Sequence, residues 1–216
     1  MKDPGYTIAV ESAVLGGSCC LAKGTQIVDE RRGSGGISRA EDLLGDIDEL
    51  LKQNSVLPGQ VTNFVVSAGP GSFTGIRIGI ATALGFCAGL NTVPLQISLL
   101  DAMASICDGE GITMVAVPAG RGMAHALIAE ITANSISYLS QPSAVALDQM
   151  SELARAAGSS RIAAFVGHFD ESLFATFDKD VLLLPRSPAA ALVSAAVDRR
   201  VTETRDPILI SKTHTS

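Results

Sequence analysis

The chain has 216 residues, of which 47% are hydrophobic, 4% are aromatic and none is tryptophan. This length suits one large domain or two small ones that share an interface, with a core filled by aliphatic side chains and alanine. The formal net charge of −6 argues against a protein that grips nucleic acid by itself, because phosphate binding depends on Lys and Arg.

The cysteines and the N-terminus indicate a reducing compartment. Cys19 and Cys20 are adjacent, and none of the four cysteines belongs to a C-x-x-C pair, so the pattern favours buried free thiols over a disulfide framework or a zinc site. The N-terminus lacks the apolar segment of a signal peptide. The apolar part of residues 78–100 is too short to span a bilayer before the turn at 91–94. We therefore expect a soluble cytoplasmic protein without membrane contact.

The chain opens with an antiparallel meander and a well-marked helix. Three β-type runs joined by short turns occur at residues 6–10, 18–22 and 25–30. Ser38 and Glu41 form a capping box, which predicts that a helix begins there. Its apolar face is formed by residues that recur at helical spacing, namely Ala40, Leu43, Leu44, Ile47, Leu50 and Leu51.

Alternating strands and helices complete the first half. In chain order they are a strand at 63–67, a helix at 74–90, a strand at 93–97 and a helix from its N-cap Ser98 to about Cys107. An antiparallel meander followed by such crossovers is typical of an α/β domain with one mixed sheet.

The second half repeats this element order more weakly. The predicted elements are strands at 113–117, 124–131 and 135–139, a helix that Asp148 caps and Gly158 stops, a strand at 162–166, and an Ala-rich helix from Ser187-Pro188 to about Arg200. Pro118–Gly122 reads as a turn. The repeat predicts two related subdomains, residues 1–108 and 109–216.

The stretch AGPGSFTG, residues 68–75, joins a strand to a helix. Its glycines allow the close approach of another backbone, and Ser72 or Thr74 can cap the helix. N–H groups at a helix start attract anions. However, a Walker motif needs Gly-Lys-Ser/Thr, whereas Ile76 follows Gly75, and no G-x-G-x-x-G fingerprint is present. The residues alone leave open both a structural turn and a ligand loop.

The helix after this loop contains glycines four residues apart, Gly75 with Gly79 and Gly85 with Gly89. Each glycine inside a helix costs about 0.5–1 kcal/mol relative to alanine. Small residues at this spacing let another helix approach closely, either within the chain or from a partner, and both alternatives remain open. If a partner binds here, a bulky residue at Gly79 or Gly85 would abolish the complex and leave a folded monomer.

The segment GPGSFTGIRIGIATALGF, with EDLLGDIDELL upstream of it, resembles the TsaB (YeaZ) family over residues 38–103. The resemblance implies two α/β subdomains of actin/Hsp70-like, ribonuclease H-like fold. It also implies a non-catalytic subunit that supports TsaD in N6-threonylcarbamoylation of adenosine 37, in tRNAs that read codons beginning with A. The implied partners are a TsaD-like catalytic subunit, a TsaE-like ATPase and a second copy of the chain, with tRNA bound only through the complex. No cofactor of its own is expected, since ATP and metal belong to the partner subunits.

The same resemblance implies the site residues. The implied partner contacts lie in the motif and its helix, at Gly69, Pro70, Gly71, Ser72, Phe73, Thr74, Gly75, Arg77, Gly79, Thr82, Ala83 and Phe86. Glu11 and Ser12 stand where the family has Asp-Thr/Ser and are candidate contacts for an anion or nucleotide, although Glu11 also reads as a solvated loop carboxylate. No catalytic or metal-binding residue is predicted. The metal site of TsaD needs two histidines one helical turn apart, whereas His125, His168 and His214 are far apart in the sequence.

The sequence departs from the family pattern at three further places. Arg39-Ala40 stand where the family often has His-Ser, Pro118–Arg121 where it has Asp-Ala-Arg, and Pro207–Ile210 resembles its ending only loosely. Two other functions remain as alternatives. One is a small ATP-dependent kinase of actin-like fold that would use Glu11 and the loop at Gly69, and the other is a structural homodimer whose function is lost.

Overall fold

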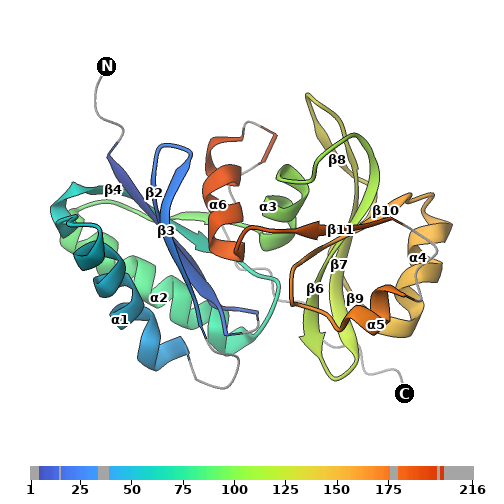
Figure 1. The fold of residues 1–216 in the computed structure, drawn as a ribbon, viewed down its shortest axis with the longest axis horizontal. Helices are drawn as coiled ribbons and strands as arrows, with labels where there is room; N and C mark the ends of the chain where they lie inside the picture. Colours follow the sequence, from blue (N-terminus) through green and yellow to red (C-terminus); the bar gives the residue numbers. More distant parts are fainter. Residues whose placement is uncertain (1–4, 15, 34–38, 176–179, 199, 202–216) are drawn as a thin grey trace.

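In a computed structural model the chain forms five layers in which helices alternate with sheets (Figure 1). Two helices cover the outer face of the first sheet, two lie between the sheets, and two cover the outer face of the second sheet. The structure describes residues 5–14, 16–33, 39–175, 180–198 and 200–201. The predicted fold class, two mixed sheets with flanking helices, is confirmed.

The first sheet contains the predicted meander. Its five strands, in the order in which they pair, are β3 (Gln26–Arg32), β2 (Ser18–Lys23), β1 (Tyr6–Glu11), β4 (Val61–Ser67) and β5 (Leu95–Ile97). β1, β2 and β3 pair antiparallel, whereas β4 and β5 run parallel to β1. Parallel neighbours need crossover connections, which α1 (Arg39–Gln53) and α2 (Phe73–Leu90) supply.

The helices α1 and α2 pack side by side on the outer face of this sheet. Leu43, Ile47 and Leu50 of α1 are buried there, as their spacing predicts. Leu44 was assigned to the same face and is instead 60% exposed, because it is turned about 100° from Leu43 around the helix axis. The predicted capping box cannot be assessed, since Ser38 and the side chain of Glu41 lie outside the described residues.

The second sheet has six strands, two of which the sequence analysis missed. In spatial order they are β11 (Asp180–Leu184), β10 (Arg161–Phe165), β6 (Gly111–Gly120), β7 (Met123–Ile131) and β8 (Ile136–Tyr138). β9 (Ser143–Ala146) pairs with the same edge of β7 as β8 does, but at the other end of β7. The missed strands are β9 and β11, which are short and lie at the edges of the sheet. Its outer face packs against α4 (Met150–Ala156) and α5 (Glu171–Phe174).

Two local predictions for the second half are wrong. Asp148 does not cap a helix, because it lies inside a 3-10 turn at Leu147–Gln149, and Gln149 precedes α4 without a side-chain cap. The residues 118–122 are not all turn, because β6 continues to Gly120 and only Arg121 and Gly122 close the hairpin. Both hairpin residues have positive φ.

The layer between the sheets consists of α3 (Leu99–Ser105) and α6 (Pro188–Val197). Ser98 caps α3 as predicted, and α6 begins at Ser187-Pro188 as predicted, with Ser187 as its N-cap, but ends at Val197 instead of near Arg200. α6 comes from the C-terminal half, yet it packs on β1, β2 and β4 of the first sheet, and the N–H of Ala189 donates to Oγ of Ser18 at 3.0 Å. The boundary predicted between residues 108 and 109 therefore separates the two sheets. It does not separate the helices in the same way, because α6 follows the boundary and packs on the first sheet.

Candidate functional site

The glycine-rich loop between β4 and α2 lies beside the turn that joins β1 to β2. Ser72 caps α2, because its Oγ accepts a hydrogen bond from the N–H of Gly75 at 3.3 Å. The N–H of Ser72 donates to the carbonyl of Ala13 at 2.8 Å, and the N–H of Leu99 donates to the carbonyl of Gly69 at 2.7 Å. The loop thus ties together α2, the β1–β2 turn and the start of α3.

Three glycines in this region allow the β1–β2 turn to pack directly on α2. A Cβ at Gly75 would collide with the backbone of Ser12 and Ala13. A Cβ at Gly71 would lie 2.5 Å from the carbonyl oxygen of Ala13, and one at Gly79 would lie 2.5 Å from Oγ of Ser12. Oγ of Ser12 also donates to the carbonyl of Gly75 at 2.8 Å. For these three glycines the close packing occurs within the chain.

Glu11, at the end of β1, is fully buried and closes the β1–β2 turn. Its Oε1 accepts hydrogen bonds from the N–H groups of Ala13 at 2.5 Å and Val14 at 3.2 Å. The interpretation of Glu11 as a solvated carboxylate is therefore wrong. These two N–H groups are the donors that an anion would use at such a turn, and the hydroxyl of Ser12 is already bonded to Gly75. The geometry therefore gives no support to the predicted anion or nucleotide contact at Glu11 and Ser12.

α2 presents a continuous row of small and apolar residues to solvent. We call this row the outer face of α2, and it comprises the exposed residues Phe73, Thr74, Arg77, Ala81, Leu84, Gly85, Ala88 and Gly89. Leu84 is 53% exposed and Phe73 is 46% exposed. The guanidinium of Arg77 lies 3.6 Å from the ring centroid of Phe73, so these two large side chains are held together at one end of the row.

The predicted partner contacts divide into two groups in the structure. The ones that pack inside the chain are Gly69, Pro70, Gly75, Gly79 and Ala83, which are buried and therefore cannot contact a partner in this arrangement. The others are at least partly exposed, namely Gly71, Ser72, Phe73, Thr74, Arg77, Thr82 and Phe86.

The later pair of glycines is different from the earlier one. A Cβ at Gly85 or Gly89 would meet nothing within 4 Å, so neither glycine is needed for packing within the described chain. Their spacing predicts close packing, but neither residue belongs to the predicted site. The expectation that a bulky residue at Gly79 leaves a folded monomer is not supported, because Gly79 contacts Ser12, whereas the same expectation fits Gly85.

By length and composition alone, α2 qualifies as a membrane-crossing helix, and it is 18 residues long. The prediction that its apolar run is too short for a bilayer is therefore wrong. Five of its residues are buried against the first sheet, namely Gly75, Ile76, Gly79, Ala83 and Cys87. Other apolar residues of α2 are partly buried against the same core, namely Ile78, Ile80, Phe86 and Leu90, and only its exposed residues form the outer face of α2.

The two histidines that the structure describes lie on different elements. His125 lies on β7, His168 follows β10, and His214 is outside the described residues. Within the described ranges, no three His, Cys, Asp or Glu residues form a group that could hold a metal ion.

The four cysteines are free and buried, as predicted. Burial raises the pKa of the Cys107 thiol to about 12 and raises the pKa of Cys20 and Cys87 as well. A thiol must ionise to act as a nucleophile, so these cysteines are suited to packing and not to chemistry.

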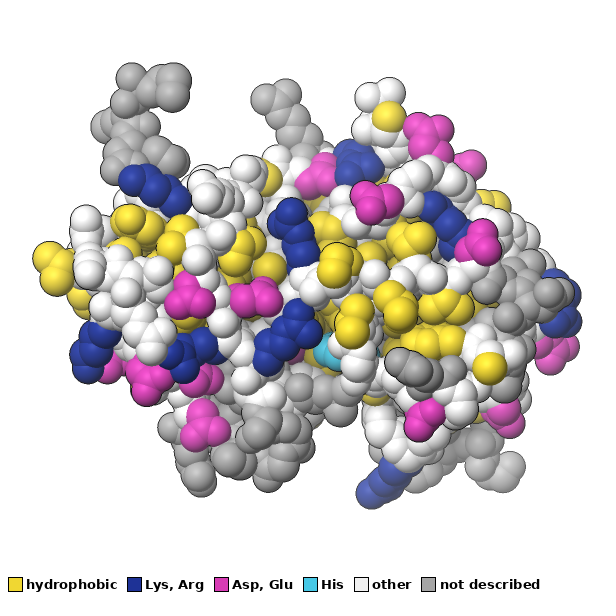
Figure 2. Space-filling model, in the orientation of Figure 1, with side chains coloured by type: hydrophobic (Ala, Val, Ile, Leu, Met, Phe, Trp, Pro, Cys, Tyr) yellow, Lys and Arg dark blue, Asp and Glu magenta, His cyan; other side chains and the backbone are white. Residues whose placement is uncertain are grey.

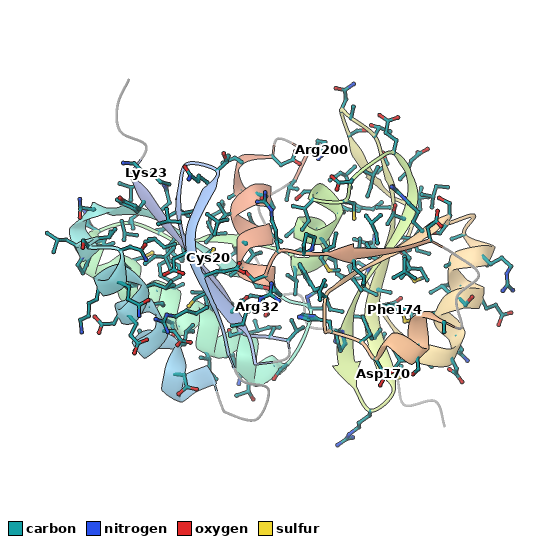
Figure 3. All side chains as sticks on the ribbon, in the orientation of Figure 1. Cys20, Lys23, Arg32, Asp170, Phe174 and Arg200 are labelled. Atoms are coloured by element: carbon teal, nitrogen blue, oxygen red, sulfur yellow. The ribbon has the colours of Figure 1, made fainter. Side chains whose placement is uncertain are left out.

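His168 lies half-buried between the two halves, with its ring 5.2 Å from that of Phe165. Burial, and to a lesser extent the positive charge of nearby Arg32, lowers the pKa of His168 to about 4. Figure 3 shows Arg32 at the edge of the first sheet that faces the second half. His168 is thus neutral in the folded protein at neutral pH.

We expect the free energy of unfolding to decrease as the pH is lowered from 6.5 to 4, because of His168. The unfolded chain takes up this proton near pH 6.5, whereas the folded protein does so only near pH 4. The stabilisation is complete above pH 6.5, and about 2 kcal/mol is lost by pH 4, after allowance for partial exposure. Urea unfolding of the wild type and of His168→Gln at a series of pH values measures it. Parallel curves for the two proteins would contradict the expectation.

The chain is similar in sequence to proteins of tRNA threonylcarbamoyladenosine biosynthesis. A family model described as TsaD, tRNA N6-adenosine threonylcarbamoyltransferase, matches residues 38–195. The tRNA threonylcarbamoyladenosine biosynthesis protein TsaB of Buchnera aphidicola is 47% identical over 57 residues, which are 26% of this chain and 25% of that protein. TsaB of Haemophilus influenzae is 40% identical over 62 residues, 29% of this chain and 26% of that protein. The matched segments thus span about a quarter of these two relatives.

The fold is also similar to a solved structure. YeaZ from Pseudomonas aeruginosa superposes with a TM-score of 0.67, at 18% identity, over 96% of this chain and 99% of that one. The similarity at this low identity concerns the fold alone, and it extends over nearly the whole of both chains.

Proposed function

The chain belongs to the family of the matching TsaD model and, within it, to the TsaB/YeaZ group, and from this premise we propose that it is a partner subunit in tRNA threonylcarbamoyladenosine biosynthesis. In this role it supports a TsaD-like catalytic subunit that adds the N6-threonylcarbamoyl group to adenosine 37. It performs no catalysis of its own. The relatives named TsaB support the pathway, and the geometry of the chain supports the partner role.

The observation that carries the partner role is the outer face of α2. It combines an aromatic residue, an arginine and a leucine with small residues that allow close approach. Aromatic and arginine side chains dominate the energetics of protein interfaces. Gly85 and Gly89 have no packing role in the described chain, although each costs helix stability. A helix of the catalytic subunit laid against this face accounts for both features.

The proposal assigns ATP and metal to the partner subunits. At the β1–β2 turn, where nucleotide-using relatives of this fold hold phosphate, Glu11 and Ser12 are bonded within the chain. The kinase alternative would need those groups for its substrate. A TsaE-like ATPase as third subunit, contact with tRNA only through the complex, and a cytoplasmic location complete the proposal.

Reconstitution tests the function directly. The TsaD-like and TsaE-like subunits of the same organism, ATP, threonine, bicarbonate and an unmodified tRNA of the substrate class are incubated with and without this chain, in the presence of the enzyme that makes the threonylcarbamoyl donor. We expect modified adenosine only when the chain is present, and the chain to co-purify with the TsaD-like subunit. Full modification in its absence would refute the supporting role, and modification by this chain without the TsaD-like subunit would refute its being non-catalytic.

A further inference from the structure

β11 is the edge strand of the second sheet and carries an exposed apolar surface. In the part of the chain that the structure describes, β11 pairs only with β10. Leu183 on β11 and Val166 after β10 are 46% and 47% exposed. Figure 2 shows hydrophobic side chains gathered over this region, beside arginine and histidine side chains. An exposed apolar edge strand favours pairing with another strand.

The backbone N–H and C=O groups of β11 point alternately toward β10 and toward the open edge of the sheet. The carbonyl of Leu184 accepts a hydrogen bond from the N–H of Val166, which follows β10. The backbone N–H and C=O groups of Leu184 therefore point toward β10. The carbonyl of Pro185 points the other way and accepts a bond from Arg32 at 3.1 Å. Since the bonding direction alternates along a strand, the N–H and C=O groups of Val181 and Leu183 face the open edge.

The sequence of this edge is complementary to itself in the antiparallel direction. The run Asp180–Arg186 reads DVLLLPR, with an acid at one end and a base at the other. If two copies pair around Leu183, each Asp180 lies opposite Arg186 of the other copy. Leu182 then faces Leu184, and Leu183 faces its own counterpart. Opposite charges and apolar pairs across strands both stabilise a sheet.

We propose that two copies of this chain associate through β11, edge to edge and antiparallel, around a two-fold axis at Leu183. In this register the two Leu183 residues exchange a pair of backbone hydrogen bonds. Each Val181 N–H donates to the second lone pair of the Pro185 carbonyl in the other copy, beside the bond that this carbonyl accepts from Arg32 of its own chain, and the ladder ends there because proline has no N–H. Arg32, bonded to Pro185, adds a second positive charge near the partner copy's Asp180.

This contact uses a surface distant from the outer face of α2. β11 lies in the second half, whereas α2 covers the far side of the first sheet (Figure 1). The two surfaces can therefore be occupied at once, and the inference does not depend on the proposed function. Its test is made with chains that also carry Ala81→Arg, so that association through α2 is suppressed.

Charge reversal is the decisive test. Asp180→Arg and Arg186→Asp each place like charges opposite each other at both ends of the ladder, so each variant alone should dimerise about tenfold or more weakly than the unreversed chain. An equimolar mixture of the two variants restores opposite charges at both ends and should form heterodimers. Sedimentation velocity over a wide concentration range, with one variant fluorescently labelled, measures both effects.

Two outcomes would overturn the proposal: an unreversed chain that stays monomeric at all concentrations, or dimers that the reversals and the mixture leave unchanged. Cross-linking checks the register. Leu183→Cys should be joined between copies by a short bis-maleimide, because the paired Cα atoms would be about 5.5 Å apart. Val93→Cys, exposed on the first half, is the matched control and should not be joined. The native cysteines are buried. Equal cross-linking of the two variants would also contradict the proposal.

Discussion

Alanine at Gly75 should destabilise the protein by about 3 kcal/mol or more, whereas alanine at Gly85 of the same helix should stabilise it by about 0.5–1 kcal/mol. The Cβ at position 75 would collide with the backbone of Ser12 and Ala13, which cannot move without disturbing β1. At position 85 the Cβ meets nothing within 4 Å, and only the better helix propensity of alanine remains. The same substitution thus has opposite signs at two places on one helix.

Urea unfolding followed by far-UV circular dichroism measures both variants. The midpoints should move in opposite directions at an unchanged m value. A third variant, Gly79→Ala, should fall between them, because its close neighbour is a serine side chain, Oγ of Ser12, and not backbone. A Gly75→Ala protein as stable as the wild type would show that the turn does not pack on α2 as described.

Arginine at Ala81 or Gly85 should weaken binding to a TsaD-like subunit by about a hundredfold while leaving the chain folded. Both positions are exposed on the outer face of α2, so the new side chain extends into solvent in the free protein. In the proposed complex it would hold the helices apart and bury a charge without a partner. Isothermal calorimetry with the purified subunit gives the affinity, and circular dichroism gives the fold.

A matched variant separates this effect from the addition of charge alone. Ala156→Arg places the same substitution on an exposed position of α4, at the far end of the molecule. It should bind as the wild type does. Equal weakening by all three variants, or none by Ala81→Arg and Gly85→Arg, would remove the outer face of α2 from the interface.

Much of the fold follows from local signals. The meander, the two capped helices that begin after Ser98 and Ser187, and the strand that leads into the glycine-rich loop were all predicted from short-range patterns. β11 was missed because its apolar run lacks the alternation of a half-buried strand, since one side of its sheet packs on α6 and the other on α5. The prediction that Asp148 caps a helix is wrong because aspartate is common both at helix N-caps and in the turns that precede helices.

The sequence predicts where the site lies. It does not predict which of the glycines pack within the chain and which are exposed to a partner. Four glycines at helical spacing indicate close packing, and sequence cannot tell which of them meets the chain itself. That depends on where the β1–β2 turn lies, and Ser12 is more than sixty positions from Gly75. Glu11 was misread for a similar reason, because its buried position depends on a turn that folds back over it.

The position of α6 has a consequence for how the protein is made. The inner face of the first sheet is covered by a helix that begins only at Pro188, far along the chain from Ile97, where the last strand of that sheet ends. During synthesis, β1 to β5 are therefore complete long before the helix that shields them exists. The nascent chain carries an uncovered apolar surface until α6 has been synthesised, and the two halves are expected to gain protection from amide exchange together, as one cooperative unit, once α6 docks.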